Sequence, residues 1–598
     1  MPPKSRRKIE DLDDGRFHGS DALAVSLIRK WAWGGLSAAD VQEFSLAAKH
    51  SGADSAEIRK LASIGSFGVN KQNCHRDLIR YVCPSTACVP EPTAIQVPYF
   101  DNKGSSDVAL LCEMQCILPL DWIDTMASSP ETKDLFQLDF CPREDLQRFW
   151  MSQDLERNPK FKNHPILEKE DASKGIPVTF HSDGAQFQDR GSLTILSMAP
   201  LLSKAAPVDE NLLVAACPKD CYVPGPQGTW ASIWQWVVWS MTWLFRGVHP
   251  NADPFGKVFE KDTYRGKKAG KPILPQGMFI FLWAFLADME FLMNDLGLPH
   301  HAAEYPCGWC QGNKSDVPYN DFRLAALWKN TVPKSPPTDH VIMQIPGMTV
   351  WHFALDMLHV MELGGTSQMI GNVLFYIVYM LMTDVTRTAA CNRIWSEILE
   401  LYEELEVHHD HRLKELHLKN FSDTKAPWKN FPCCHFMKAT EVKGLIKPVL
   451  RLAERYCDMS DDEGKHVVLA MRNLSVFYDA LSSAPMTPDE SHRKKLNDSM
   501  TKFLLHYSYL GKLAFDQRRQ MYSFVPKIHY MAHLAQQAMF LNPKYVTCYS
   551  GEDYVGQISQ LGHTCLYGTV GWKLSVPLFG KYRIAMYLRF TWHIDIYL

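Results

Sequence analysis

The stretch Ile176–Gly184, IPVTFHSDG, constrains the fold of this chain more than any other. The residues Ile176–Phe180 are apolar or β-branched, a glycine precedes them, and the turn-like letters SDG follow. This pattern predicts a short buried strand that ends in a turn. A carboxylate at the end of a buried strand is held rigidly, as a ligand for a hard metal ion must be, which makes Asp183 a candidate ligand. An Asp-Gly pair is also an ordinary turn signal, so the stretch alone leaves both interpretations open.

A second apolar run is also followed directly by an acidic residue. The segment Met278–Ala287 is predicted to be a buried strand or helix, and Asp288 follows it directly. Two further strands, Leu193–Met198 and Leu212–Ala216, are expected between the two acids. The region therefore predicts a sheet whose strands carry Asp183 and Asp288.

A two-metal site needs a third carboxylate from another element of the same fold. Two divalent ions bound by such acids activate a water or a 3′-hydroxyl and stabilise the leaving oxygen of a phosphodiester. The best late candidate is Glu552, with Asp553 beside it, on a helix expected to begin at an N-cap Ser550 and to run to about Gly562. Taken alone, a residue such as Glu552 is most often a first-turn acid that favours the helix dipole.

The most specific local motif is Cys307-Gly308-Trp309-Cys310. Two thiols separated by two residues can hold one metal ion on a tight turn, and a zinc site needs two further ligands. The spacing H-x-x-x-H places His529 and His533 on one helical face, which makes them the preferred partners. Asp356 and His359 are a second candidate pair. A redox dithiol and a pair of plain thiols remain as alternatives.

One stretch, 257–271, is rich in basic residues. Because the chain has a formal net charge of −3, any contact with nucleic acid has to come from such a local patch. A solvated surface explains the stretch equally well. The candidate phosphate-binding residues are Lys257, Lys261, Arg265, Lys267 and Lys268.

The composition indicates the kind of cellular compartment in which the protein works. The chain has 16 cysteines and no secretory signal peptide is recognised, which favours a reducing environment with thiols that are free or bound to metal. The longest apolar runs, Gly277–Ala287 and Val373–Met382, are shorter than the roughly 20 residues that span a bilayer, so no membrane association is expected.

The predicted organisation begins with helices at Ala22–Trp33, Ala38–His50 and Glu57–Ile64, the second capped by Ser37. A tryptophan-rich helix is expected at Ala231–Val248, buried on most sides. The expected regions are a disordered basic tail (1–18), a helical N-terminal module (19–90), a linker and helical segment (91–174), the first part of an α/β core (175–300), a large helical insertion with the Cys-x-x-Cys motif (301–525), and the second part of the core (526–598).

The motifs occur in the order HSDG, ADMEFL, CGWC, LDMLHVME, KIHYMAHL and GED. This order resembles the DDE/D transposases with an RNase H-like catalytic core, and most of all the CACTA (En/Spm-like) group and related protist mobile-element proteins. The resemblance spans about residues 175–565. It implies that Asp183 and Asp288 are the first two metal-binding acids, that Asp356 and His359 match a D-x-x-H motif, and that Glu552 is the late acid. Asp553 and Glu362 are rivals for the late acid, and Glu290 could share the role of Asp288.

The resemblance implies an RNase H-like mixed α/β fold and a nuclear protein that carries out DNA transposition, as a homo-oligomer when active. Mg²⁺ or Mn²⁺ would serve catalysis and Zn²⁺ would serve structure. The chain departs from the family near its end, HIDIYL, and many genomic copies of such elements are decayed. Two alternatives follow: a catalytically inactive, zinc-stabilised nuclear DNA-binding protein, and an RNase H-like nuclease without strand transfer.

Overall fold

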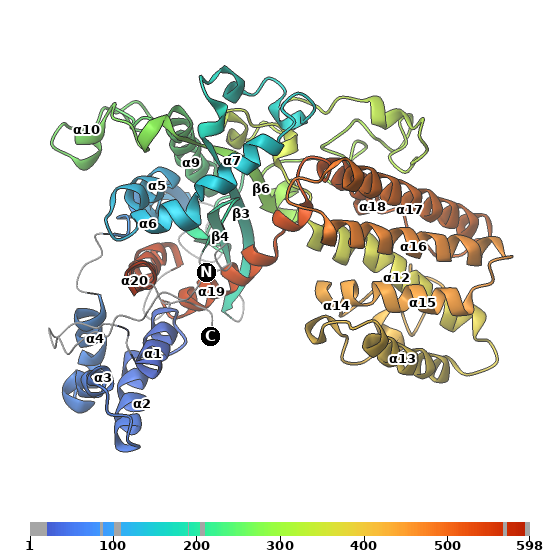
Figure 1. Ribbon diagram of the computed structural model, residues 1–598, viewed down its shortest axis with the longest axis horizontal. Coiled ribbons are helices and arrows are strands. Elements are labelled where there is room, and N and C mark those ends of the chain that lie inside the picture. The colour runs from blue at the N-terminus through green and yellow to red at the C-terminus, as the bar shows by residue number, and fades with distance from the viewer. Residues whose placement is uncertain are drawn as a thin grey trace.

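A mixed four-stranded sheet lies at the centre of the computed structural model (Figure 1). The structure describes residues 19, 21–83, 88–100, 109–188, 191–203, 210–225, 227–565 and 571–592. The basic tail expected at 1–18 lies outside these residues. The strands are β3 (Gly175–Gln188), β4 (Gly191–Pro200), β5 (Leu212–Pro218) and β6 (Phe279–Ala287), in the order β5-β4-β3-β6. The first three strands are antiparallel, and β6 runs parallel to β3.

The strand β3 does not end where the sequence predicted. Instead of turning at Ser182–Gly184, it continues to Gln188, because β4 pairs with it through Asp183↔Ile195 and Gly184↔Thr194. The parallel partner β6, in contrast, stops at Ser182↔Ala287. The predicted turn was therefore wrong, but Asp183 does lie where one of its two neighbouring strands ends.

Helices cover both faces of this sheet. Phe180 of β3 contacts the ring of Trp234 on α9 (Thr229–Arg246), with the ring centroids 6.0 Å apart. The next residue, His181, points to the opposite face, where α19 (Tyr549–His563) packs. Since side chains alternate along a strand, Asp183 lies on the α19 face.

A two-stranded antiparallel sheet, β1 (Thr93–Phe100) and β2 (Ala109–Cys116), precedes the central sheet in the chain. It joins β5 through a hydrogen bond from the Ile117 amide to the Val214 carbonyl, 3.0 Å long. The helices α5 (Pro119–Ser128) and α7 (Arg143–Ser152) follow. This strand pair was not predicted, since only an apolar stretch was recognised there.

The N-terminal helices form a small unit with its own core. They are α1 (Ala22–Ala32), α2 (Ala38–His50), α3 (Ala56–Phe67) and α4 (Cys74–Val82). Ser37 caps α2 as predicted, in a capping box with Asp40. The core of this unit is completed by Ala585 and Leu588 of α20 (Ser575–Trp592).

A long, mainly helical stretch separates β6 from α19 and lies beside the sheet, on the right of Figure 1. Its first part contains α11 (Met289–Asn294) and short 3₁₀ segments rather than long helices. The helical elements after it are η10 (Met357–Thr366), α12 (Ser367–Phe375), η11 (Tyr376–Leu381), α13 (Arg387–Glu404), α14 (Ala439–Gly444), α15 (Ile446–Tyr456), α16 (Asp462–Ser483), α17 (Glu490–Asp516) and α18 (Pro526–Gln537). None of the helices that the structure describes is both long enough and apolar enough to cross a membrane.

Candidate functional site

The pairing of β3 with β6 brings the first two predicted acids to one edge of the sheet. The last paired residues are Ser182 and Ala287, so Asp183 and Asp288 occupy the next position of two neighbouring parallel strands. Asp288 ends its strand as the N-cap of α11, and its Oδ1 accepts a hydrogen bond of 2.6 Å from the Phe291 amide. Asp183 stays within β3 while Asp288 leaves β6 at the same level, and the two carboxylates are close enough for the charge of Asp288 to act on Asp183.

The helix α19 brings the third acid to this edge. A Cβ atom at Gly551 would lie 2.4 Å from Nδ1 of His181, so only glycine allows the helix to approach β3 this closely. Further along, the Ser559 hydroxyl donates to the Gln186 carbonyl at 2.7 Å. Glu552 follows Gly551 in this helix, and its carboxylate is close enough to Asp183 for the two charges to repel each other. The helix begins after Cys548 without a side-chain cap, so the predicted capping by Ser550 was wrong.

The electrostatics of the acids indicate that they act on one another. Burial, together with the negative charge of Asp288, raises the pKa of Asp183 to about 6. Burial also raises the pKa of Glu552, and Asp183 adds to that shift while His359 opposes it. Carboxylates that are both desolvated and mutually repelling are stabilised by a bound cation, because it offsets both effects.

The Asp356–His359 pair of the predicted D-x-x-H motif contacts the third acid, and this contact was not predicted from the sequence. Asp356 is buried and caps η10, and its Oδ2 accepts hydrogen bonds from the backbone amide and from Nδ1 of His359, at 2.9 and 2.8 Å. With Nδ1 engaged, the other ring nitrogen of His359 faces Glu552, 3.7 Å from its Oε1. Burial lowers the pKa of His359, but the hydrogen bond and charge of Asp356 outweigh it, so the net shift is upward.

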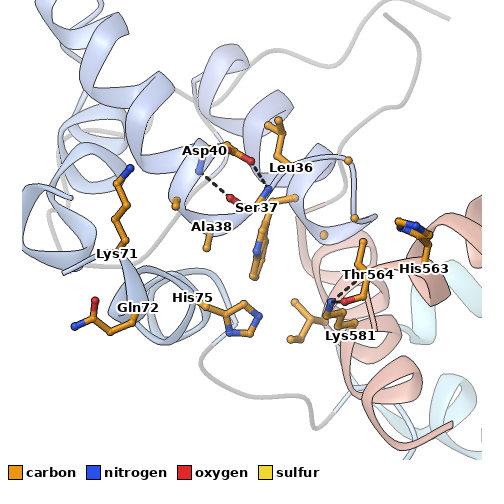
Figure 2. Close-up of a pocket in the computed structure, with 16 residues that line it drawn as sticks. Leu36, Ser37, Ala38, Asp40, Lys71, Gln72, His75, His563, Thr564 and Lys581 are labelled. Carbon is orange, nitrogen blue, oxygen red and sulfur yellow. Dashed lines mark hydrogen bonds between the residues drawn. The ribbon is translucent and has the colours of Figure 1, made fainter. Parts of the chain in front are cut away.

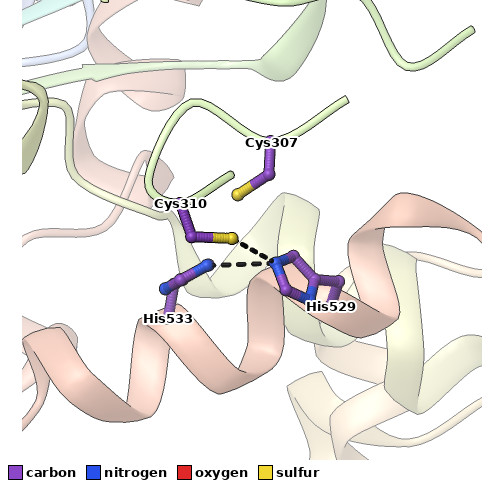
Figure 3. A group of neighbouring side chains, drawn as sticks. All are labelled: Cys307, Cys310, His529 and His533. Carbon is purple, nitrogen blue, oxygen red and sulfur yellow. Dashed lines mark hydrogen bonds between the residues drawn. The ribbon is translucent and has the colours of Figure 1, made fainter. Parts of the chain in front are cut away.

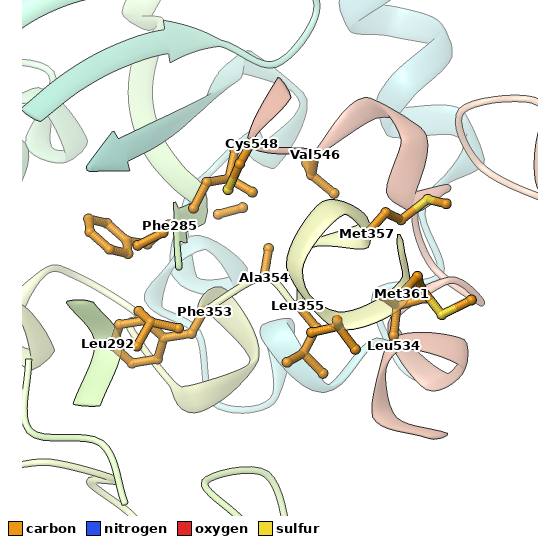
Figure 4. Packing of buried hydrophobic residues seen from close by; sticks show 14 of the residues in the cluster. Phe285, Leu292, Phe353, Ala354, Leu355, Met357, Met361, Leu534, Val546 and Cys548 are labelled. Atoms are coloured by element: carbon orange, nitrogen blue, oxygen red, sulfur yellow. The ribbon is translucent and has the colours of Figure 1, made fainter. Parts of the chain in front are cut away.

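Backbone contacts fix this pair to the sheet and to α19. The backbone of Phe353 forms an isolated parallel β-bridge with Phe285 of β6. In this bridge the Ala354 amide donates a 3.0 Å hydrogen bond to the Phe285 carbonyl. On the other side, Oδ1 of Asp356 accepts a 2.8 Å hydrogen bond from the amide of Cys548. Figure 4 shows the apolar packing around this junction, which includes Phe285, Phe353, Ala354 and Cys548.

The carboxylates of the three acids are near one another, but they are not close enough together to bind one metal ion jointly. Among the described residues, three groups place all their ligand atoms within 4.8 Å of one another: Cys307–Cys310–His529–His533, Asp356–His359–Cys548, and the exposed His408–His409–Asp410. Asp183, Asp288 and Glu552 are not one of these groups. Binding of an ion by all three therefore requires their side chains to move closer together.

The predicted cysteine and histidine ligands do meet in one buried cluster (Figure 3). The Cys310 thiol lies 3.3 Å from Nε2 of His529, which lies 3.1 Å from Nε2 of His533. Tetrahedral zinc with ordinary bond lengths would separate two nitrogen ligands by about 3.3 Å and a sulfur from a nitrogen by about 3.6 Å. The donor set and its spacing therefore fit a structural zinc ion.

The surroundings of the cluster hold the ligands in place. The Cys310 sulfur accepts a 3.2 Å hydrogen bond from the Gly312 amide, and Nδ1 of His533 pairs with Oε1 of Gln536 at 2.8 Å. The thiol of Cys307 and then the ring of His529 lower the pKa of Cys310, which favours the thiolate that binds metal. These contacts orient the ligands from outside, as is usual around zinc.

The basic stretch divides into two groups in the structure. Arg265 pairs with Asp121 at 2.9 Å, and Lys268 pairs with Asp124 at 2.6 Å, so both side chains bind the acids of α5. Their role in holding α10 (Tyr264–Lys268) against α5 could not be recognised from the sequence. The other three predicted residues are exposed: Lys257, Lys261 and Lys267.

The rival acids occupy other positions. Asp553 and Glu290 are exposed, and Glu290 lies 4.0 Å from Lys219. Glu362 is fully buried in η10 and lines a different pocket. His563, at the far end of α19, lines a pocket of about 590 Å³ against the N-terminal helices, which Figure 2 shows.

Comparison with known proteins gives no further assignment. No protein-family model matches the chain, and no curated protein matches its sequence.

Proposed function

We propose that the chain is a DDE/D-type DNA transposase with an RNase H-like core interrupted by a helical insertion. The observation that carries this proposal is the convergence of Asp183, Asp288 and Glu552 from two parallel strands and one packed helix. Three carboxylates from separate elements are the donor set that Mg²⁺ or Mn²⁺ requires. When bound, a pair of such ions activates the attacking oxygen and stabilises the leaving oxygen of a phosphodiester.

The protein residues have distinct roles in this proposal. Asp183, Asp288 and Glu552 hold the ions, and His359 positions the Glu552 carboxylate while Asp356 fixes the orientation of the imidazole. The cluster of Cys307, Cys310, His529 and His533 holds a structural zinc ion. Lys257, Lys261 and Lys267 contact the phosphates of the DNA backbone. The 3′ end freed by cleavage is then joined to target DNA.

The test is metal-dependent cleavage and joining of DNA by the full chain. We expect nicking of plasmid DNA with Mg²⁺ or Mn²⁺, and transfer of a DNA 3′ end into a second molecule. Asp183→Asn is expected to lower the rate by on the order of 100-fold or more, because it removes a charge that holds the ions. The matched control is Asp516→Asn, which alters an exposed aspartate at the end of α17, away from the three acids.

The outcomes separate the proposal from its alternatives. Full metal-dependent cleavage by the Asp183→Asn protein would overturn the assignment. Cleavage without strand transfer would identify a nuclease. Zinc binding and DNA binding without any cleavage would identify a nuclear DNA-binding protein that has lost its catalytic function.

A further inference from the structure

A second pocket, of about 440 Å³, opens between η10, α14, α16 and the segment that leads into α19. Its volume falls within the range of small-molecule sites in proteins. Apolar side chains line part of it, including Met357, Ile446 and Leu481. Such a lining accommodates a flat, uncharged ring, while the polar groups determine which ring binds.

Two buried polar groups of this pocket lack a well-formed hydrogen bond. Both carboxylate oxygens of Glu362 and the hydroxyl of Tyr549 are buried, and no hydrogen bond of 3.5 Å or less to any of them is found among the described residues. The hydroxyl of Tyr478 interacts with Glu362 more weakly, which leaves most of the accepting capacity of the carboxylate unused. The Glu362 side chain is fully buried. Buried polar atoms are costly unless they are paired, so this arrangement is incomplete without a molecule that offers hydrogen bonds.

Cationic side chains line the same pocket. Lys443, Lys447 and Lys544 come from α14, α15 and the short 3₁₀ helix η14 (Pro543–Tyr545) that precedes α19. Lys447 is paired with Asp479 at 2.9 Å, and Lys544 donates to the carbonyls of Ser482 and Ala484. The positive charge of Lys443 acts on Glu362 itself. A ligand with an anionic group is therefore favoured.

We propose that this pocket binds a guanine nucleotide. The hydrogen-bonding edge of guanine presents two adjacent N–H donors and one carbonyl acceptor. In its ionised form Glu362 accepts from the two donors, one at each oxygen, and the Tyr549 hydroxyl donates to the carbonyl. Because burial raises the pKa of Glu362 to about 8, binding of guanine should be accompanied by release of this proton and should strengthen as the pH rises toward 8. The phosphate is held by the lysines, of which Lys443 is the least engaged in other contacts.

The source of the nucleotide is either a free molecule or an unpaired guanine of a DNA strand. The pocket adjoins the acid site through two elements: Met357 follows Asp356 in the chain, and Tyr549 lies one helical turn before Glu552. A strand bound at the acids can therefore place a neighbouring base in the pocket. Both sources present the same chemistry to Glu362.

The proposal is tested by titrating the full chain with dGMP, dIMP and dAMP. Inosine keeps one ring N–H and the carbonyl but lacks the 2-amino group, and adenine lacks the carbonyl. We expect dGMP to bind at least tenfold more tightly than either. Equal affinities for the three nucleotides, or no binding of dGMP at millimolar concentration, would overturn the proposal.

Two variants separate the contacts. Glu362→Gln preserves the shape and should abolish the preference for dGMP over dIMP. Tyr549→Phe removes only the hydroxyl and should weaken dGMP and dIMP equally. The control Glu290→Gln, at an exposed acid of α11, should leave binding unchanged. If Glu362→Gln kept the full preference for dGMP, the assignment of Glu362 would be wrong.

Competition experiments identify the source, independently of catalysis. A nicked duplex with one unpaired guanine displaces dGMP if the site takes a base of a strand, and a fully paired duplex serves as control. If neither duplex competes, the ligand is the free nucleotide. The Asp183→Asn protein should still bind dGMP, so loss of cleavage and loss of nucleotide binding are distinguishable.

Discussion

At the scale of single residues, Gly551 decides how closely α19 approaches β3. Its missing side chain leaves room for the ring of His181, and the adjacent Glu552 lies beside Asp183 for that reason. His181 is itself buried, with neither ring nitrogen hydrogen-bonded within the described chain, and burial lowers its pKa to about 4. The ring therefore serves as an uncharged packing surface under the acids.

We expect Gly551→Ala to destabilise the fold by about 1–3 kcal/mol, because the new methyl group overlaps the imidazole and must displace the helix. Displacement of Glu552 should reduce metal-dependent cleavage as well. Thermal unfolding checks the first effect. Gly556→Ala is the matched control: it lies on the same helix with nothing within 4 Å of its added Cβ, so it should be neutral or stabilising. Equal effects of the two substitutions would contradict this explanation.

The titration of Glu362 should make the free energy of unfolding depend on pH. Its burial raises its pKa from 4.5 to about 8. Between these values the folded protein holds a proton that the unfolded chain has released, so stability falls as the pH rises through this range. Glu362→Gln should remove this dependence and stabilise the protein at pH 8 by on the order of 1–3 kcal/mol. Denaturant unfolding at pH 5 and pH 8 is the measurement, and an unchanged difference between the two would contradict it.

Candidate ligands were easier to recognise in the sequence than the residues that contact and orient them. Asp183 and Asp288 were recognisable because apolar runs lead into them, and His529 and His533 because their spacing defines a helical face. The contact of His359 with Glu552 joins residues far apart in the chain. Since such a contact depends on how η10 and α19 pack, no local pattern could have revealed it.

At the scale of elements, α18 links the two candidate metal centres. One face carries His529 and His533 of the cysteine–histidine cluster, and Tyr530 donates to the carbonyl of Pro306 next to the cysteine loop. At its start, Lys527 is attracted by Asp288 and Asp356, although burial lowers its pKa overall. A change in the position of α18 therefore affects both centres.

We expect Cys310→Ser to lose bound zinc and to lower the unfolding temperature by several degrees, because the loop of Cys307 and α18 lose their common anchor. Metal analysis of the purified protein and thermal unfolding are the measurements. Cys391→Ser is the control, a buried cysteine of α13 outside the cluster. Retention of zinc by the Cys310→Ser protein would show that these residues are not the ligands.

Element boundaries were predictable where local signals control them. The capping residues Ser37 and Asp40 define the start of α2 within the sequence itself. The extension of β3 past Asp183 depends instead on hydrogen bonds from β4, which a turn-like Asp-Gly sequence does not reveal. Tertiary pairing outweighed local turn preference there.

At the scale of the whole molecule, α10, which carries the exposed Lys267, lies on the opposite side from α16 and α17 (Figure 1). The contacts of Arg265 and Lys268 with α5 leave Lys257, Lys261 and Lys267 as the predicted residues still available to phosphate. This division makes the proposed DNA surface testable by its dependence on salt.

Replacing Lys257, Lys261 and Lys267 together by alanine should weaken DNA binding and reduce the slope of log affinity against log salt by about 2 to 3, if each contacts one phosphate. Binding to a labelled duplex at several salt concentrations gives this slope. The control replaces the exposed Lys465, Lys502 and Lys512 of α16 and α17, and should leave the slope unchanged. Equal slopes for the two triple variants would exclude the stretch as a DNA contact.

The order in which the acids occur along the chain has a consequence for protein synthesis. A ribosome completes β3 and β6 early, but it makes α19 only after the entire helical stretch has been translated. Every product that stops before Tyr549 carries Asp183 and Asp288 without Glu552 and without the helix that covers their face of the sheet. In a cell, nascent and prematurely terminated chains thus lack the third acid, and the complete set exists only once synthesis has passed α19.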